Sequence, residues 1–220
     1  MRTQYITHTP IHLTYRLYGS IPNLPLRKLH SSLRYKKLRL RQQLDQARQS
    51  RDRDEIDLYR SALTYTEIDH YLQYDNLLDR PVGGPTYLAD ERAKRIVTAS
   101  WHHIARQRGL RIYAISVMSN HVHVLLETVD EETEVNLPQT LEDHKKYTAT
   151  QLNKLHGTKG RRVWAEKEYC REVRRGTFEQ VLWYVLNNPV KAGLTNEPLN
   201  WGGNWWNKEV YASFIATRVA

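Results

Sequence analysis

Cysteine is almost absent from this 220-residue sequence, in which Cys170 is the single example. One cysteine forms neither a disulfide within the chain nor a cysteine-built zinc site. Long apolar runs are also lacking. None approaches the roughly 20 residues of a membrane-spanning helix, and residues 1–17 contain no apolar block of signal-peptide length. We therefore expect a soluble, cytoplasmic protein without a membrane partner.

Negative charge is in deficit. The sequence has 33 Lys and Arg residues against 24 Asp and Glu residues, a net charge of +9 and a pI near 9.6. It also contains 14 Tyr and 6 Trp residues. Nucleic acid is a polyanion whose flat bases stack on aromatic rings, so this composition suits a nucleic-acid partner. The same positive excess is equally compatible with solubility alone.

The periodicity of the chain predicts an α+β fold. Residues 11–18, 110–117 and 121–128 have the β-rich patterns of strands, and a three-residue turn joins the last two as in an antiparallel hairpin. The sequence also predicts three helices, over residues 90–108, 137–156 and 177–188, the last of them stopped by Pro189. A short extended segment is expected over residues 164–173. This order predicts helices packed against an antiparallel sheet.

A highly charged segment follows the first strand, at about residues 26–74. Its leucines recur at helical spacing, and basic residues fill the other faces. This pattern predicts a helical insertion that is either a solvated hairpin or a dedicated DNA-binding surface. We otherwise expect a single domain over residues 1–220, with a Trp-rich tail at about 195–220.

The strand at 121–128 begins with two histidines. Residues i and i+2 of a strand point to the same face, so His121 and His123 project together while Val122 and Val124 point the other way. Two imidazoles on a rigid strand form a bidentate ligand for a divalent cation and leave coordination positions for water or phosphate oxygens. The alternative is a pair of half-exposed histidines that bind no metal.

The last predicted helix contains Tyr184 and Asn188, four residues apart and therefore on one face. A phenol is a weak nucleophile at neutral pH, but it becomes competent when a metal withdraws charge from a target phosphate. The amide oxygen of Asn188 is suited to complete the shell of such a metal. Alternatively, Tyr184 is a core or cap residue and Asn188 ends the helix before Pro189.

Taken together, these motifs resemble those of the REP-associated tyrosine transposases, which are single-tyrosine HUH transposases of the IS200-like type. Four stretches contain the resemblance, which spans about Ile11 to Leu194: IHLTYRLYGSIP, YDNLLDRPVGGPTYLAD, VMSNHVHVLLE, and WAEKEYCREV through YVLNNPVKAGL. One departure is Ser119, where the family usually has proline. The resemblance implies a ferredoxin-like (RRM-like) fold in which the sheet bears the histidines and the last helix brings the tyrosine against them.

The resemblance also implies cleavage and rejoining of single-stranded DNA at palindromic or imperfectly palindromic repeats folded as hairpins. Tyr184 would form a 5′-phosphotyrosine link and release a 3′-hydroxyl, and His121, His123 and Asn188 would hold Mg²⁺ or Mn²⁺. Imidazole ligands by themselves favour Mn²⁺ or Zn²⁺ over Mg²⁺. Because the covalent link conserves the phosphodiester energy and no P-loop motif occurs, no nucleotide cofactor is expected. Relatives include monomers and dimers, so a monomer or a homodimer is expected.

Other aromatic and basic residues are candidates for the DNA interface. Trp164 either stacks on an extruded base or belongs to the core, and Tyr147 and Tyr169 are the alternative nucleophiles. Five arginines close in sequence to the predicted chemistry are the candidates for phosphate contacts: Arg161, Arg162, Arg171, Arg174 and Arg175.

Two other functions remain as alternatives. A non-catalytic hairpin-binding protein, kept for repeat maintenance or regulation, would bind the same DNA without forming an adduct. Its binding would require none of the chemistry of His121, His123, Tyr184 and Asn188, whose joint presence therefore argues against it. A metal-dependent phosphodiesterase that uses activated water would tolerate the loss of the Tyr184 hydroxyl.

Overall fold

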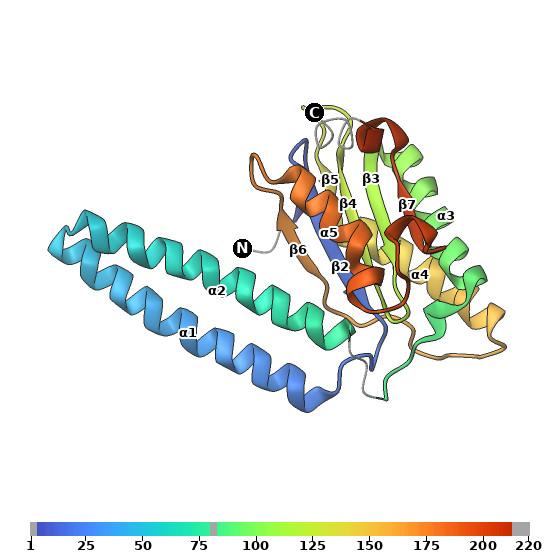
Figure 1. The fold of residues 1–220 in the computed structure, drawn as a ribbon, viewed down its shortest axis with the longest axis horizontal. Coiled ribbons are helices and arrows are strands. Elements are labelled where there is room, and N and C mark those ends of the chain that lie inside the picture. The colour runs from blue at the N-terminus through green and yellow to red at the C-terminus, as the bar shows by residue number, and fades with distance from the viewer. Residues whose placement is uncertain (1–3, 80–82, 213–220) are drawn as a thin grey trace. The chain divides into compact units, whose positions relative to one another are not determined.

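The computed structural model describes residues 4–79 and 83–212 and divides the chain into two compact units (Figure 1). The larger unit consists of Met1–Ser20 and Pro85–Ala220, and the smaller unit is Ile21–Gly84. Gly19 and Pro85, close to the points where the chain leaves and re-enters the larger unit, are neighbours, since a Cβ on Gly19 would lie 3.8 Å from Cδ of Pro85. None of the helices within the described ranges is long and apolar enough to cross a membrane.

The larger unit is built on a five-stranded antiparallel sheet with the order β6-β2-β4-β3-β7. Its strands are β2 (Ile11–Arg16), β3 (Leu110–Val117), β4 (His121–Thr128), β6 (Tyr169–Glu172) and β7 (Asn204–Trp206). The first four strands, with helices α3 (Glu91–Arg108) and α4 (Leu137–Leu155), follow the βαββαβ order of ferredoxin-like folds. The predicted α+β, ferredoxin-like class is confirmed.

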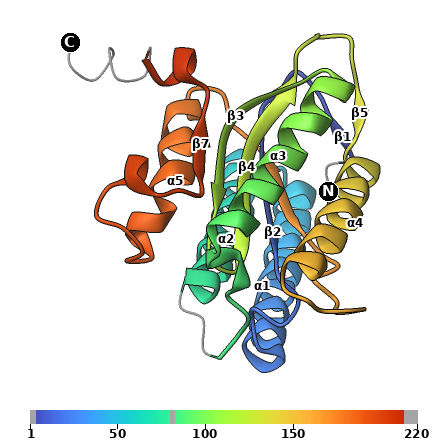
Figure 2. The ribbon, with the colours of Figure 1, turned by 90° about the vertical axis from the view of Figure 1, so that its right-hand side faces the viewer.

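Helices cover both faces of this sheet (Figure 2). α3 and α4 lie on one face, over a core that includes Trp101, Val122 and Val124, and α5 (Phe178–Lys191) lies on the other, over Leu125. Alternate residues of β4 therefore face different helices, as the period of a strand requires. His121 and His123 stand at alternate positions of β4 with Leu125, so all three side chains point to the α5 side.

Smaller elements complete the unit. β1 (Tyr5–Ile6) and β5 (Val135–Asn136) form a two-stranded ribbon, and two short 3₁₀ helices, η1 (Tyr87–Ala89) and η2 (Pro198–Asn200), lie in the connections. The sequence patterns predicted neither the ribbon nor β7, because segments of two or three residues are too short to show alternation.

The prediction that Pro189 stops the last helix is wrong, since α5 continues to Lys191. Proline removes one N–H donor and is costly in a helix interior, but here it lies within the last turn. That turn is closed by backbone hydrogen bonds from Ala192 to Asn188 (2.9 Å) and from Leu194 to Pro189 (2.8 Å). Asn188 consequently lies inside the helix and does not cap it.

The smaller unit is a helical hairpin of α1 (Asn23–Ser50) and α2 (Arg53–Asp79). Arg51 makes the turn in the left-handed conformation (φ 60°), and its N–H bonds to the last carbonyls of α1. Ion pairs join the helices, from Lys36 to Asp69 (3.5 Å) and from Lys37 to Glu67. The predicted helical insertion is present, and it is longer at both ends than the segment expected from its leucines.

A chain of buried hydrogen bonds crosses the core between the sheet and the α3–α4 layer. Trp101 Nε1 donates to the hydroxyl of Tyr15 (2.9 Å), which is paired with His144 Nε2 at 2.6 Å. His144 Nδ1 lies 2.9 Å from the hydroxyl of Ser100. The neutral imidazole, with its proton on Nδ1, satisfies both partners. Burial, together with the positive charge of Lys145, lowers the pKa of His144 to about 3.

We expect this histidine to make stability depend on pH. Between the ordinary pKa of 6.5 and about 3, only the unfolded chain binds the proton of His144, so the free energy of unfolding falls as the pH drops through this window. The contribution approaches about 1.4 kcal/mol per pH unit. The stability advantage of the wild type over His144→Gln in urea unfolding is expected to shrink from neutral pH toward pH 4. An advantage that is independent of pH would contradict this account.

Candidate functional site

The face of the sheet toward α5 bears a row of polar side chains across its central strands. β4 pairs with β2 so that His123 lies opposite Thr14 and His121 lies opposite Arg16. On the other side, β3 places Ser116 beside His123. Because directly paired residues share a face, these side chains form one polar patch on an otherwise apolar sheet.

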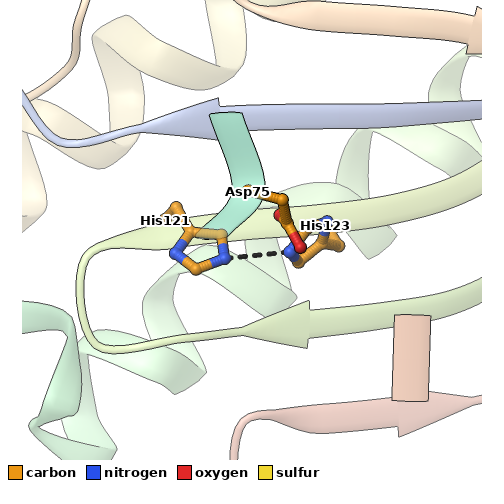
Figure 3. Close-up of side chains that lie close together, drawn as sticks. All are labelled: Asp75, His121 and His123. Atoms are coloured by element: carbon orange, nitrogen blue, oxygen red, sulfur yellow. Dashed lines mark hydrogen bonds between the residues drawn. The ribbon is translucent and has the colours of Figure 1, made fainter. Parts of the chain in front are cut away.

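The two predicted histidines meet within this patch (Figure 3). The Nε2 atoms of His121 and His123 lie 2.9 Å apart, and the ring planes are inclined by 81°. Both side chains are buried. Figure 3 also draws Asp75, which belongs to the separate hairpin unit, so the site is defined by the larger unit alone. Two imidazole nitrogens that converge in this way are suited to a single cation.

The outer nitrogens of the two rings have partners of their own. His121 Nδ1 lies 2.6 Å from Oδ1 of Asn120, so its proton is donated there and Nε2 keeps its lone pair. His123 Nδ1 lies 3.0 Å from Oγ1 of Thr14 and 3.1 Å from Nε2 of His12. These contacts orient both rings so that their Nε2 atoms face each other.

The structure brings the predicted tyrosine to the histidines. The ring centroid of Tyr184 is 6.2 Å from that of His123 and 5.8 Å from that of His12, in edge-on arrangements. Lys191, two helical turns further along α5, has its ammonium nitrogen 5.5 Å from the Tyr184 centroid. A half-buried phenol therefore lies beside the imidazoles and next to a positive charge.

Asn188 lies one helical turn beyond Tyr184 on α5. Its Nδ2 donates to the carbonyl of Tyr184 (2.8 Å), while its Oδ1 is buried and has no hydrogen-bond partner among the residues that the structure describes. An unpaired buried acceptor is costly, and an amide oxygen is a ligand that hard cations accept. Two imidazole nitrogens suit a divalent metal ion, and the oxygen of Asn188 is a further donor of the kind that such an ion accepts.

Sequence reasoning missed His12, the residue that contacts both His123 and Tyr184. It lies in β2 opposite Arg171 on one side and Leu125 on the other. The alternation of β2 already put His12, Thr14 and Arg16 on one face, so the signal was present in the sequence. What it lacked was the pairing of β2 with β4, which chain periodicity does not specify.

The five candidate arginines fall into two groups. Arg171, in register with His12, lies on β6 beside the site, and Arg174 and Arg175 are exposed in the turn before α5. Arg161 and Arg162 line an open groove of about 580 Å³ along α4, on the opposite side of the sheet. Their guanidinium groups stack on tyrosine rings 4.0 and 4.4 Å away, and Arg161 also bonds to Asn153. The structure does not bring this second group to the histidines.

The remaining aromatic candidates also differ in position. Trp164 is buried, and its Nε1 donates to Thr148 (2.9 Å), so it belongs to the core. Tyr147 is exposed on α4, away from the α5 side. Tyr169 pairs with Thr14 in the register of β6 and β2 and shares the face of the histidines.

Residues 86–188 match the family model described as "Transposase IS200 like". This region, which contains His121, His123, Tyr184 and Asn188, belongs to the IS200-like transposase family, and the family expected from the motifs is confirmed. No curated protein matches the chain.

Two solved structures are similar to the chain. One is described as a REP-associated tyrosine transposase bound to a REP hairpin, with a TM-score of 0.46 and 14% identity over 91% of this chain and 78% of that one. The other is described as a transposase from Deinococcus radiodurans R1, with a TM-score of 0.38 and 16% identity over 81% of this chain and 89% of that one.

The orphaned oxygen of Asn188 leads to a prediction about metal binding. Saturating Mn²⁺ is expected to raise the melting temperature of the wild type, because a ligand that binds only the folded state stabilises it. Asn188→Leu removes the unpaired acceptor, so the metal-free protein should be no less stable, while the affinity for Mn²⁺ falls by about tenfold or more. The same change at the half-buried Asn187 is the control. Equal Mn²⁺ affinity in both variants would exclude Asn188 as a ligand.

Proposed function

We propose that this protein cleaves and rejoins single-stranded DNA at hairpin-forming repeats, with Tyr184 as the nucleophile. The observation that supports the proposal is the approach of the Tyr184 ring to His123, whose Nε2 faces that of His121, within a region of the IS200-like transposase family. A nucleophile next to a phosphate-polarising centre is the arrangement that transesterification needs.

In the proposed reaction, the hydroxyl oxygen of Tyr184 attacks the phosphorus of a phosphodiester. A bond forms between this oxygen and phosphorus, the bond from phosphorus to the 3′ oxygen breaks, and the 5′ phosphate stays on the tyrosine. The phenol proton leaves to water, and the departing 3′ oxygen takes up a proton from water. The ammonium of Lys191 supplies positive charge next to the ring while negative charge develops on it.

The residues proposed to hold the cation are His121, His123 and Asn188. When bound, Mg²⁺ or Mn²⁺ withdraws charge from a non-bridging phosphate oxygen and thereby makes phosphorus more electrophilic. Thr14 and Asn120 orient the imidazoles through their Nδ1 atoms, and His12 packs against both His123 and Tyr184. Two nitrogen ligands favour Mn²⁺ over Mg²⁺ in affinity.

The DNA strand is proposed to approach along the β6 edge and the turn before α5. Arg171, Arg174 and Arg175 are the arginines on this side, and their guanidinium groups suit phosphate oxygens. Each such contact binds the backbone without reading its sequence.

A covalent adduct is the direct test. We expect a single-stranded oligonucleotide with a hairpin, incubated with Mn²⁺, to yield a protein–DNA adduct that survives denaturing electrophoresis. Tyr184→Phe lacks the attacking oxygen and should yield none, while binding of the oligonucleotide is retained. Tyr147→Phe and Tyr169→Phe are matched controls that should keep adduct formation.

Each alternative has its own result in this experiment. Cleavage that persists in Tyr184→Phe would indicate a phosphodiesterase that uses water. Binding without an adduct in any variant would indicate a protein that only binds hairpins.

A further inference from the structure

The two helices of the hairpin unit differ in charge. α1 contains one acidic residue, Asp45, and eight basic ones: Arg27, Lys28, Arg34, Lys36, Lys37, Arg39, Arg41 and Arg48. α2 contains two basic residues, Arg53 and Arg60, and seven acidic ones: Asp54, Glu55, Asp57, Glu67, Asp69, Asp75 and Asp79. Two ion pairs between the helices use only Lys36 and Lys37 of this basic set. Attraction between α1 and α2 therefore does not account for most of the positive charge of α1.

Four arginines of α1 recur at every seventh position: Arg27, Arg34, Arg41 and Arg48. Seven residues are close to two helical turns, so these side chains form one row that drifts by about 20° per step. At 1.5 Å per residue, neighbours in the row are about 10 Å apart and the whole row is about 31 Å long. All four residues are exposed.

Most of this row has no acidic partner. Arg48 bonds to Asp45 (3.2 Å), but Arg27, Arg34 and Arg41 form no ion pair or side-chain hydrogen bond with any residue that the structure describes. Cations on one rigid element, without a counterion from the protein, concentrate positive potential along that element. A solvated helix usually interleaves both signs of charge, and this face does not.

Exposed apolar and aromatic side chains lie within the same surface. Leu38 is four residues after Arg34 and three before Arg41, so it lies between these two arginines, and its side chain is 58% exposed. Tyr35, three residues before Leu38, is 68% exposed. A tyrosine among arginines supplies van der Waals contact and a hydroxyl donor to a sugar–phosphate surface.

We propose that the arginine row of α1 binds the phosphate backbone of the double-stranded stem of a DNA hairpin. The choice of a DNA hairpin rests on the function proposed above. A gently winding row of about 31 Å is close in length to one helical turn of DNA, about 34 Å, and each guanidinium suits two phosphate oxygens. A flexible single strand would gain less from a rigid, regularly spaced row.

The alternative partner for the arginine row is the acidic helix α2 of a second copy of this chain. Three carboxylates of α2 already have cationic partners within the hairpin: Asp57 with Arg60, Glu67 with Lys37, and Asp69 with Lys36. Asp54 and Glu55 lie in the first turn of α2, where they complement the helix dipole. Five of the seven acidic residues of α2 thus have a cationic partner or the helix dipole beside them, and DNA is the better counterpart for α1.

The test compares two double variants of the full chain. Arg34→Gln with Arg41→Gln removes two charges from the row, and Arg53→Gln with Arg60→Gln removes two from α2 of the same hairpin. Affinity for a labelled stem-loop, whose stem exceeds one helical turn, is measured by fluorescence anisotropy in EDTA over a range of salt concentrations. Glutamine preserves helix propensity, and far-UV circular dichroism verifies it.

We expect the α1 variant to bind the stem-loop at least about tenfold more weakly near 0.1 M salt, and its slope of log K against log salt to be shallower by about 1.8. The α2 variant should match the wild type, and an unpaired oligonucleotide of equal length should bind all three proteins alike. Equal weakening by both variants, no weakening, or equal loss of unpaired DNA would each overturn the proposal.

Two further readouts separate this proposal from dimerisation through α1 and from the proposed role of Tyr184. A dimer that dissociates in the α1 variant, with stem affinity unchanged, would assign the row to a second copy and overturn binding to DNA. Adduct formation plays no part in the anisotropy measurement, so failure of Tyr184 as a nucleophile would leave the result for α1 unaffected. Conversely, loss of stem binding by the α1 variant leaves cleavage of an unpaired strand as an independent test of Tyr184.

Discussion

Burial of Val122, Val124 and Leu126 beneath α3 and α4 is the constraint on which the site depends. Side chains alternate strictly along a strand, so holding these three residues in the core forces His121 and His123 to the opposite face. A shift of β4 by one residue would move the valines out of their core to the polar patch beside α5 and place the imidazoles in the apolar layer. The free energy of burying three aliphatic side chains, about 1.5–3 kcal/mol each, opposes that shift. The orientation of the histidines is thus a by-product of core packing.

The helix α5, on the other face of the sheet, is held in place by a different set of contacts. α5 packs on the sheet through a smaller apolar cluster that includes Leu125, Val181, Leu182 and Val185. Asn204 of β7 adds polar contacts, donating to the carbonyls of Leu186 (2.8 Å) and Pro198 (2.7 Å). The distance between the tyrosine and the histidines is therefore set by a few apolar contacts and by a strand at the edge of the sheet. The histidine strand lies at the centre of the fold, and the tyrosine helix lies at its periphery.

The sequence was most informative where local pattern and tertiary burial agree. Residues 110–117 and 121–128 form the two strands expected over those ranges, because apolar side chains repeat along both. It was least informative where a partner distant in the chain decides the outcome. His12 joins the site through the pairing of β2 with β4, and β7 exists because three residues of the Trp-rich tail pair with β3. The length of α5 was underestimated because a proline is harmless in the last turn of a helix, where its neighbours find other hydrogen bonds.

The closeness of Gly19 and Pro85 has a topological consequence. A segment whose two ends emerge side by side closes no large loop in the body that hosts it, so lengthening, shortening or removing that segment changes the chain entropy of the host only slightly. The strand order of the ferredoxin-like sheet therefore places little constraint on the length of the α1–α2 segment.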